Sequence, residues 1–324
     1  MTAPNTVNYR YVCLATKVRY PINEAGMTRL EGVLTALVTP FSPTGDLSVP
    51  ELRRQVERQV SYGNGIFCGG TNGEFFSLHT AEKFVLAREC VEAAAGRVPV
   101  VAHVGAITPA ATIALGRDVA ALDVDAISVI TPWLVPLRQD ELVEHFSRIA
   151  DAIDKPIYLY NIPPFAKNRL EPETVATLAQ HGNIRGIKDS SGDWDSIARF
   201  LDVAKESPDF KVMSGPDHLA REGFMAGCSA CVSGLANLVP HSVNLIWSRF
   251  KAGDSEGSLA AQDVVSALRA ELHALGFAPA AVKKALSLAG ENVGSTRHVS
   301  RFSLEATEQI RRIVDKYFKD AEHG

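Results

Sequence analysis

The sequence lacks any long hydrophobic run and any concentrated charge of one sign. Its longest apolar stretches are strand-sized, far short of the ~20 residues that a helix needs to cross a bilayer. Among 324 residues, 33 basic and 37 acidic side chains give a formal net charge of −4, and the basic ones are scattered. Membrane spanning is therefore excluded, and nucleic acid is not expected as a partner. With 46% apolar residues, the composition is that of a globular chain with a sizeable core.

Cysteine is scarce and odd in number. Five cysteines in a long chain indicate reduced thiols, as in a cytoplasmic protein. Cys228 and Cys231 form a single C-x-x-C, without the second pair or the H-x-x-x-H that would complete a zinc site. We expect two small buried residues there rather than a metal or redox pair. Asp123 and Asp125 also lack further oxygen ligands, so a solvated turn is favoured over a cation site.

The first 26 residues lack any acidic side chain before Glu24 and carry three basic ones. This pattern loosely resembles a transit peptide, but serine and arginine are few and two prolines interrupt the segment. We favour a flexible N-terminal extension over residues 1–28.

Eight short apolar runs, each bounded by turn-forming residues, are spaced along the middle of the chain. Their near-continuous apolar character is typical of parallel strands that are covered on both faces. Segments with helical spacing of apolar residues separate them, for example 49–63 and 194–206. The runs are Val33–Thr39, Gly65–Gly70, Val98–Val104, Asp125–Thr131, Pro156–Asn161, Ile184–Lys188, Phe210–Ser214 and Ala230–Leu235.

This alternation of strands and helices predicts a (β/α)8 TIM barrel, an α/β fold, over residues 29–253. A doubly wound sheet is less favoured, because no G-x-G-x-x-G loop follows the first strand. After Leu235 the pattern becomes entirely helical. Helical spacing over 256–275, 278–289 and 303–318 predicts a C-terminal helical region, residues 254–324, appended to the barrel.

Lys188 ends the sixth run, and in such barrels the chemistry lies at the C-terminal ends of the strands. Because side chains alternate along a strand, Gly186 and Lys188 point into the barrel while Ile187 faces the helices. Burial disfavours the ammonium form, and a neutral amine is what attack on a ketone carbonyl needs. A structural lysine paired with an acid is the alternative, which position alone does not exclude. Gly186 would leave room beneath the lysine stem.

Tyr160 and a glycine-rich loop favour the catalytic interpretation of the lysine. Tyr160, next to the end of the fifth run, lies on the inward face, where a phenol beside a carbinolamine can shuttle protons. An aromatic plug of the barrel core is the alternative for this side chain. The loop 69–74, Gly-Gly-Thr-Asn-Gly-Glu, can present backbone N–H groups, a hydroxyl and an amide to a carboxylate. A plain strand-to-helix turn is the alternative for this loop. For His103, at the end of the third run, we expect a hydrogen-bonded structural histidine rather than a base.

Three motifs at these strand ends resemble the dihydrodipicolinate synthase / N-acetylneuraminate lyase superfamily: G-T-N-G-E at 70–74, Y-N-I-P at 160–163 and G-I-K-D-S at 186–190. The resemblance implies that Lys188 forms an imine with a 2-oxo acid and that Tyr160 shuttles protons. It also implies that Thr71 and Asn72 bind the carboxylate of pyruvate. A homotetramer is implied, with no metal and no cofactor beyond the covalent imine. Further substrate contacts are implied for Ser190, Asp217 and Val232.

Departures from the superfamily's pattern bear on the substrate. Dihydrodipicolinate synthases carry a second tyrosine after the fourth strand, where this chain has Trp133 and Leu134. They also carry an arginine that grips the aldehyde's carboxylate, where this chain has Phe165 and, two residues on, Lys167. The loss of a bidentate clamp argues against lysine biosynthesis. Segment 102–105 is similar instead to sialate lyases. Segment 187–193 is similar to 4-hydroxy-2-oxoglutarate aldolases and 2-keto-3-deoxy-sugar-acid aldolases. The apolar side chains Trp133, Leu134 and Phe165 also allow an aromatic hydroxy-oxo acid as the substrate.

The expected activity is that of a class I aldolase, which cleaves or forms a 4-hydroxy-2-oxo acid or a 2-keto-3-deoxy sugar acid. Its partners are pyruvate and an aldehyde. Lys188 would attack the ketone, and Tyr160 would take the C4 hydroxyl proton as the C3–C4 bond breaks. A dehydratase that acts through the same imine is the first alternative. A barrel that only binds 2-oxo acids and a metal-dependent aldolase are rivals from other classes; the first would need Lys188 or Tyr160 to be missing.

Overall fold

Eight parallel strands close into a barrel in the computed structural model, which describes residues 30–321 and side chains to Phe318. The strands follow one another in sequence order, and β8 pairs with β1 to close the barrel. The predicted TIM barrel is confirmed. The expected N-terminal extension lies outside the described residues. The strands are β1 Gly32–Ala36, β2 Gly65–Cys68, β3 Val100–His103, β4 Ala126–Ile130, β5 Ile157–Asn161, β6 Ile184–Asp189, β7 Lys211–Ser214 and β8 Ala230–Ser233.

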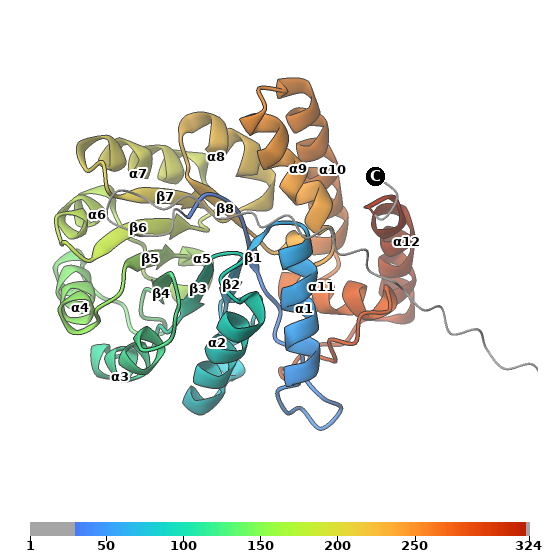
Figure 1. Cartoon of the computed structure of the whole chain (residues 1–324), viewed down its shortest axis with the longest axis horizontal. Helices are drawn as coiled ribbons and strands as arrows, with labels where there is room; N and C mark the ends of the chain where they lie inside the picture. Colours follow the sequence, from blue (N-terminus) through green and yellow to red (C-terminus); the bar gives the residue numbers. More distant parts are fainter. Residues whose placement is uncertain (1–29, 322–324) are drawn as a thin grey trace, which may run out of the picture.

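Helices alternate with the strands and cover the outside of the barrel (Figure 1). Their starts follow local signals: the Thr108 hydroxyl accepts the Ala111 N–H at the start of α3, and Pro109 occupies its first turn. The helices are α1 Val49–Ser61, α2 Thr80–Ala94, α3 Pro109–Ala120, α4 Gln139–Ala152, α5 Pro163–Ala166, α6 Pro172–Ala179, α7 Trp194–Glu206, α8 Ala220–Ala226 and α9 Pro240–Lys251. Three 3-10 turns, η1 Phe75–Ser77, η2 Asp217–Leu219 and η3 Leu235–Asn237, follow β2, β7 and β8.

The strands separate two apolar layers. Phe67, Tyr158 and Tyr160 belong to the buried cluster inside the barrel, whereas Ile187 belongs to the outer cluster, together with helix residues. The alternation expected along β6 is therefore confirmed. The space at Gly186 is not free for the lysine stem, however. A Cβ at Gly186 would come within 2.5 Å of the Tyr158 ring, so Tyr158 fills the position that we expected to be open.

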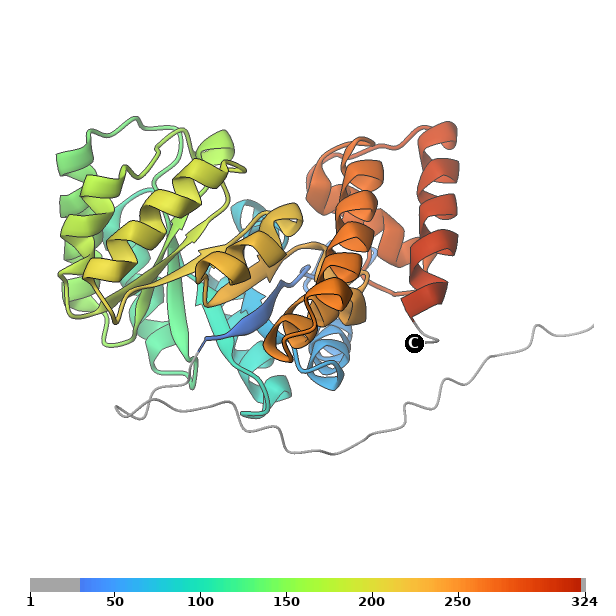
Figure 2. The same cartoon turned by 90° about the horizontal axis from the view of Figure 1, so that it is seen from above.

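Three C-terminal helices lie together on one side of the barrel (Figure 2): α10 Ser255–His273, α11 Ala278–Leu288 and α12 Leu304–Ala321. They share one buried cluster with Val33 of β1 and Cys231 of β8. The helical appendage is thus packed onto the barrel through a common core. Within the described part of the chain, no helix combines the length and the apolarity that crossing a membrane requires.

Candidate active site

Lys188 and Tyr160 lie side by side on neighbouring strands. They are register partners on β6 and β5, and only 4% and 1% of their surfaces are exposed. The Lys188 Nζ lies 4.0 Å from the centroid of the Tyr160 ring and 4.4 Å from that of Phe67. Its neighbours are therefore aromatic faces, which attract a cation but provide no proton acceptor as strong as a carboxylate. The buried lysine that pairs with an acid is a different one, Lys283.

Thr71 completes a hydrogen-bonded pair with the tyrosine. The Thr71 and Tyr160 hydroxyls are 2.9 Å apart, and Thr71 is buried. The loop that carries Thr71 turns tightly, with Gly69 at a φ of 66°, and the Thr39 hydroxyl donates to the Gly73 carbonyl at 2.7 Å. The structure thus brings three sequence-predicted residues together at the C-terminal ends of β2, β5 and β6.

Glu74 fixes the same loop from the other side, a role that the sequence pattern did not suggest. Its carboxylate is fully buried and accepts from Lys283 Nζ at 2.8 Å and from the Arg297 N–H at 3.0 Å. His298 Nδ1 lies 3.2 Å from the second carboxylate oxygen. The C-terminal region therefore holds the loop of Thr71, and a lone glutamate at the end of a glycine-rich motif carried no signal of such distant partners.

A second buried pair supports the strand ends of β5 and β6. Asn161 Nδ2 donates to Asp189 at 2.7 Å, and the Ser191 hydroxyl donates to the other Asp189 oxygen at 2.6 Å. Burial raises the pKa of Asp189, while these donors oppose that effect. Ser190, half-buried, follows directly, and its N–H donates to the Asn161 carbonyl at 2.8 Å. The residues that flank Tyr160 and Lys188 in the sequence thus lock the two strand ends together.

The remaining candidates lie at β7, β8 and the loop after β2. Asp217 is buried, and its Oδ1 accepts from the Ser233 hydroxyl and, at 3.4 Å, from the Leu235 N–H. Val232 is buried in the cluster inside the barrel. Asn72 is half-buried, and its carboxamide lies against Gly234, where a Cβ would come within 2.9 Å of Nδ2. The loop after β2 therefore meets the turn after β8.

His103 differs from expectation. Neither of its ring nitrogens has a hydrogen-bond partner, although the side chain is buried. The ring packs edge-on against Phe75 and Tyr160, at centroid distances of 5.0 and 5.8 Å. Burial, followed by the charges of Lys83 and Lys188, holds the pKa of His103 well below its usual range. The prediction of a hydrogen-bonded histidine was wrong, because aromatic packing rather than hydrogen bonding fixes this ring.

The cysteines and acids set aside in the sequence form no metal site in the structure. Cys228 and Cys231 are buried and unpaired, and burial raises the pKa of Cys228 to about 12. The prediction of two small buried residues is confirmed. Asp125 accepts from the Val100 N–H at 2.7 Å. Over residues 30–321, no group of three or more His, Cys, Asp or Glu side chains is placed to hold a metal ion.

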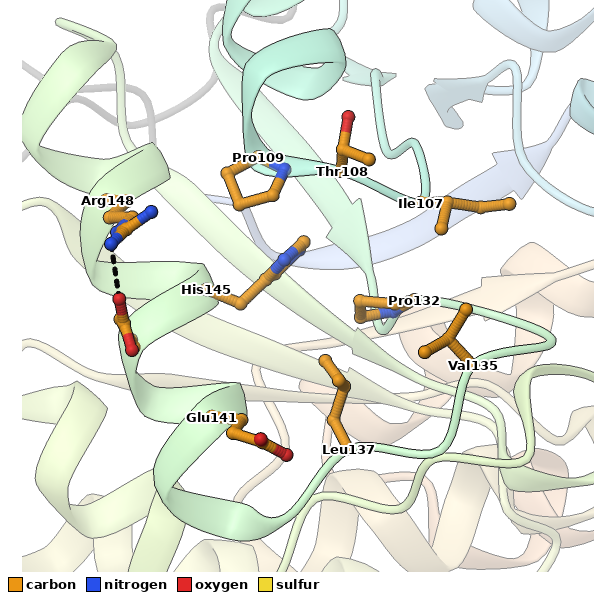
Figure 3. Close-up of a pocket in the computed structure, with 10 residues that line it drawn as sticks. Ile107, Thr108, Pro109, Pro132, Val135, Leu137, Glu141, His145 and Arg148 are labelled. Carbon is orange, nitrogen blue, oxygen red and sulfur yellow. Dashed lines mark ion pairs between the residues drawn. The ribbon is translucent and has the colours of Figure 1, made fainter.

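A pocket of about 320 Å³ lies elsewhere, between α3, α4 and the loop after β4 (Figure 3). His145 projects into it from α4; the ring is buried, and Nε2 has no partner. Glu144 and Arg148 form an ion pair at its edge. Its apolar lining includes Pro109 and Leu137. None of the predicted site residues lines this pocket. The candidate catalytic side chains lie instead at the C-terminal end of the barrel.

Comparison with known proteins identifies the family of this chain. The model of the dihydrodipicolinate synthetase family matches residues 29–317. The chain belongs to this family. An uncharacterized DapA-like lyase of Halobacterium salinarum is 35% identical over 83% of this chain and 87% of its own length. A 4-hydroxy-tetrahydrodipicolinate synthase of Roseobacter denitrificans is 39% identical over 72% of this chain and 79% of its own.

Solved structures of the family superimpose closely. Dihydrodipicolinate synthase of Thermotoga maritima has a TM-score of 0.84 at 28% identity and covers 89% of this chain and 99% of that one. The Acinetobacter baumannii enzyme, solved in complex with pyruvate, has a TM-score of 0.83 at 28% identity, with 90% and 99% covered. This chain thus shares both the sequence pattern and the fold of the dihydrodipicolinate synthetase family.

Proposed function

We propose that this member of the family is an aldolase that cleaves or forms a 4-hydroxy-2-oxo acid or a 2-keto-3-deoxy sugar acid. One observation carries the proposal: a buried lysine amine lies against a tyrosine whose hydroxyl is 2.9 Å from that of Thr71. In an aldolase of this kind, an amine nucleophile and a proton carrier must act on adjacent atoms of one substrate. The complex of the Acinetobacter relative supports pyruvate as the 2-oxo acid.

The reaction begins when Lys188 attacks the ketone and water leaves, which gives an imine. Thr71 and Asn72 hold the carboxylate, and Ser190, Asp217 and Val232 line the rest of the substrate. Tyr160 takes the proton of the C4 hydroxyl, the C3–C4 bond breaks, and its electron pair enters the enamine while C4 leaves as an aldehyde. Protonation of C3 and addition of water to the imine release pyruvate and regenerate Lys188. A dehydratase would use the same imine to acidify C3 and expel a hydroxyl group.

Synthesis of hydroxytetrahydrodipicolinate, the activity in the names of several relatives, is less favoured. Phe165 stands where a carboxylate-gripping arginine is expected, and its side chain is 56% exposed. A phenyl ring cannot form the bidentate pair that an aldehyde with a distal carboxylate requires. We expect a homotetramer, as the family resemblance implies.

Borohydride trapping tests the imine. Reduction in the presence of pyruvate should add one reduced pyruvyl group to Lys188, located by peptide mass spectrometry. Lys188→Met should abolish the adduct, and Lys211→Met, on an exposed lysine of the next strand, should keep it. An adduct at another lysine, or none, would overturn the mechanism. Full cleavage activity after EDTA treatment should hold as well, since the proposed steps use no metal.

Tyr160→Phe tests the proton carrier separately. The variant keeps the ring against Lys188 and loses only the hydroxyl bonded to Thr71. Loss of a general acid–base group lowers kcat by about 10²–10⁴-fold, so we expect slow cleavage with trapping still detectable. Near-normal cleavage would remove Tyr160 from the mechanism.

A further inference from the structure

Six ring side chains at the C-terminal end of the barrel contact one another in series. The series begins at Tyr160, beside Lys188, and ends at Phe165, a little further along the same segment. Both ends of the series therefore lie on the short segment 160–165, and the rings between them come from other parts of the chain. We name these six side chains the aromatic circuit. Its centroid distances are 5.8 Å for Tyr160–His103, 5.0 Å for His103–Phe75, 5.7 Å for Phe75–Phe76, 6.5 Å for Phe76–Phe277 and 5.7 Å for Phe277–Phe165.

The far side of the circuit is exposed. Phe76 is 45% exposed and Phe165 is 56% exposed, and Trp133 joins the circuit at Phe75 with a centroid distance of 5.2 Å. Covering exposed phenyl rings with an apolar group lowers the free energy in proportion to the area removed from water. Edge-to-face contacts at these distances also favour another ring as the covering group. The circuit therefore links the reactive lysine to aromatic surface that a ligand can still bury.

Charged groups are few along this path. The Phe165 side chain replaces a cation, and the low pKa of His103 keeps that ring neutral. Lys83 lies beside the circuit, with Nζ 5.6 Å from the Phe75 centroid, and Lys167, two residues after Phe165, is exposed. Burial lowers the pKa of Lys83, so its own surroundings disfavour the charged form.

Asp217, for which the family resemblance implies a substrate contact, already uses one of its two carboxylate oxygens within the protein. Asp217 directs Oδ1 to the Ser233 hydroxyl and to the Leu235 N–H within the protein. A sugar hydroxyl would have to compete with both internal donors for this oxygen. Displacing either one would leave a buried donor without its partner, which costs free energy. The internal contacts of Asp217 thus occupy Oδ1 only, whereas the aromatic circuit favours an apolar tail.

We infer that the aldehyde half of the substrate carries an aromatic ring, so that the enzyme cleaves 4-hydroxy-2-oxo-4-arylbutanoates to pyruvate and an aryl aldehyde. This rests on the proposed function and selects among its substrates. The bonds are those of the aldol cleavage: C3–C4 breaks, the hydroxyl proton passes to Tyr160, and water releases pyruvate from Lys188. The ring on C4 lies against Phe76 and Phe165.

A comparison of three substrates tests the selection. Pyruvate release is measured from 4-hydroxy-2-oxo-4-phenylbutanoate, from 2-keto-3-deoxygluconate and from 4-hydroxy-2-oxoglutarate. We expect kcat/KM for the phenyl compound to exceed the other two by at least about tenfold, a difference of about 1.4 kcal/mol. A preference for the sugar acid, or for the dicarboxylate through Lys83, would overturn the inference.

Variants at the exposed end of the circuit sharpen the test. Phe165→Ala should lower kcat/KM for the phenyl compound about tenfold more than for the sugar acid, mostly through KM. Phe165→Arg should raise kcat/KM for the dicarboxylate, because it supplies a carboxylate clamp. Met225→Ala, on a side chain of α8 that is 59% exposed and outside the circuit, is the matched control and should change neither. An equal loss on all substrates in Phe165→Ala would contradict an aromatic contact.

Borohydride trapping with pyruvate alone separates this inference from the proposed function, because pyruvate lacks the aldehyde half. A Lys188 adduct without preference for the phenyl compound overturns only the aromatic assignment. Absence of the adduct overturns the aldolase mechanism and the assignment with it.

Discussion

The buried carboxylate of Glu74 accepts a hydrogen bond from the Lys283 ammonium at 2.8 Å, joining the loop after β2 to helix α11. Both side chains are almost fully buried, at 0% and 2% exposed. Burial lowers the pKa of Lys283, and the charge of Glu74 opposes that effect. An ion pair this deep is strongly destabilising to break, because it leaves an uncompensated charge out of water. The pair therefore couples the C-terminal region to the loop that carries Thr71.

We predict that Lys283→Met lowers the free energy of unfolding by about 3–5 kcal/mol, since Glu74 loses its ammonium partner in a buried site. Urea denaturation at neutral pH measures this. The double variant with Glu74→Gln should recover part of the loss, because the buried charge is then removed. If Lys283→Met were as stable as the wild type, the pair would not bind the two regions together.

Thr71→Val should slow catalysis without unfolding the protein. Valine has nearly the same shape as threonine but removes the hydroxyl that lies 2.9 Å from the Tyr160 hydroxyl. We expect kcat/KM for cleavage to fall by about five- to tenfold, as the net loss of a buried hydrogen bond of about 1–1.5 kcal/mol implies. Thr71→Ser keeps the hydroxyl and should stay close to the wild type. Equal activity of the valine and serine variants would contradict a role for the hydroxyl.

Gly186→Ala should destabilise the barrel. The new Cβ would come within 2.3 Å of the Lys211 carbonyl oxygen and 2.5 Å of the Tyr158 ring, so a strand or the ring must shift. Overpacking of this kind costs about 1–3 kcal/mol. Gly182→Ala, just before β6 where a Cβ meets nothing within 4 Å, is the matched control. Comparable thermal midpoints for the two variants would mean that the barrel interior relaxes around Gly186.

The barrel could be predicted from the sequence because its signal is repeated and local. Each apolar run, such as Val98–Val104, contains the strand that the structure places there or overlaps it closely, as Val33–Thr39 does with β1. Short elements were not predicted, because a segment of about one turn has too few residues to show the helical spacing of apolar side chains. Helix α5 is one turn long, and Asp217–Leu219 forms a 3-10 turn just before α8.

From the sequence, the candidate site could be predicted only for residues that lie at strand ends or within recognisable motifs. Lys188 and Tyr160 lie at the ends of neighbouring strands and Thr71 follows β2, so closure of the barrel brings the three together. The partners of Glu74 could not be read, because Lys283 lies 209 residues away and no local pattern encodes that contact. His103 was misjudged for a related reason: whether a buried ring meets donors or other rings depends on packing across several elements.

The pH dependence of stability follows from His145. Burial lowers the pKa of His145 to about 4, against about 6.5 in the unfolded chain. Between these values the unfolded chain binds a proton that the folded chain does not, so stability is lost as pH falls from about 6.5 to about 4. The loss attributable to this residue reaches up to about 3 kcal/mol. His145→Leu should lose correspondingly less stability than the wild type when urea denaturation is repeated at pH 7 and pH 4.5. If both proteins lost the same amount over this interval, protonation of His145 would not be linked to unfolding.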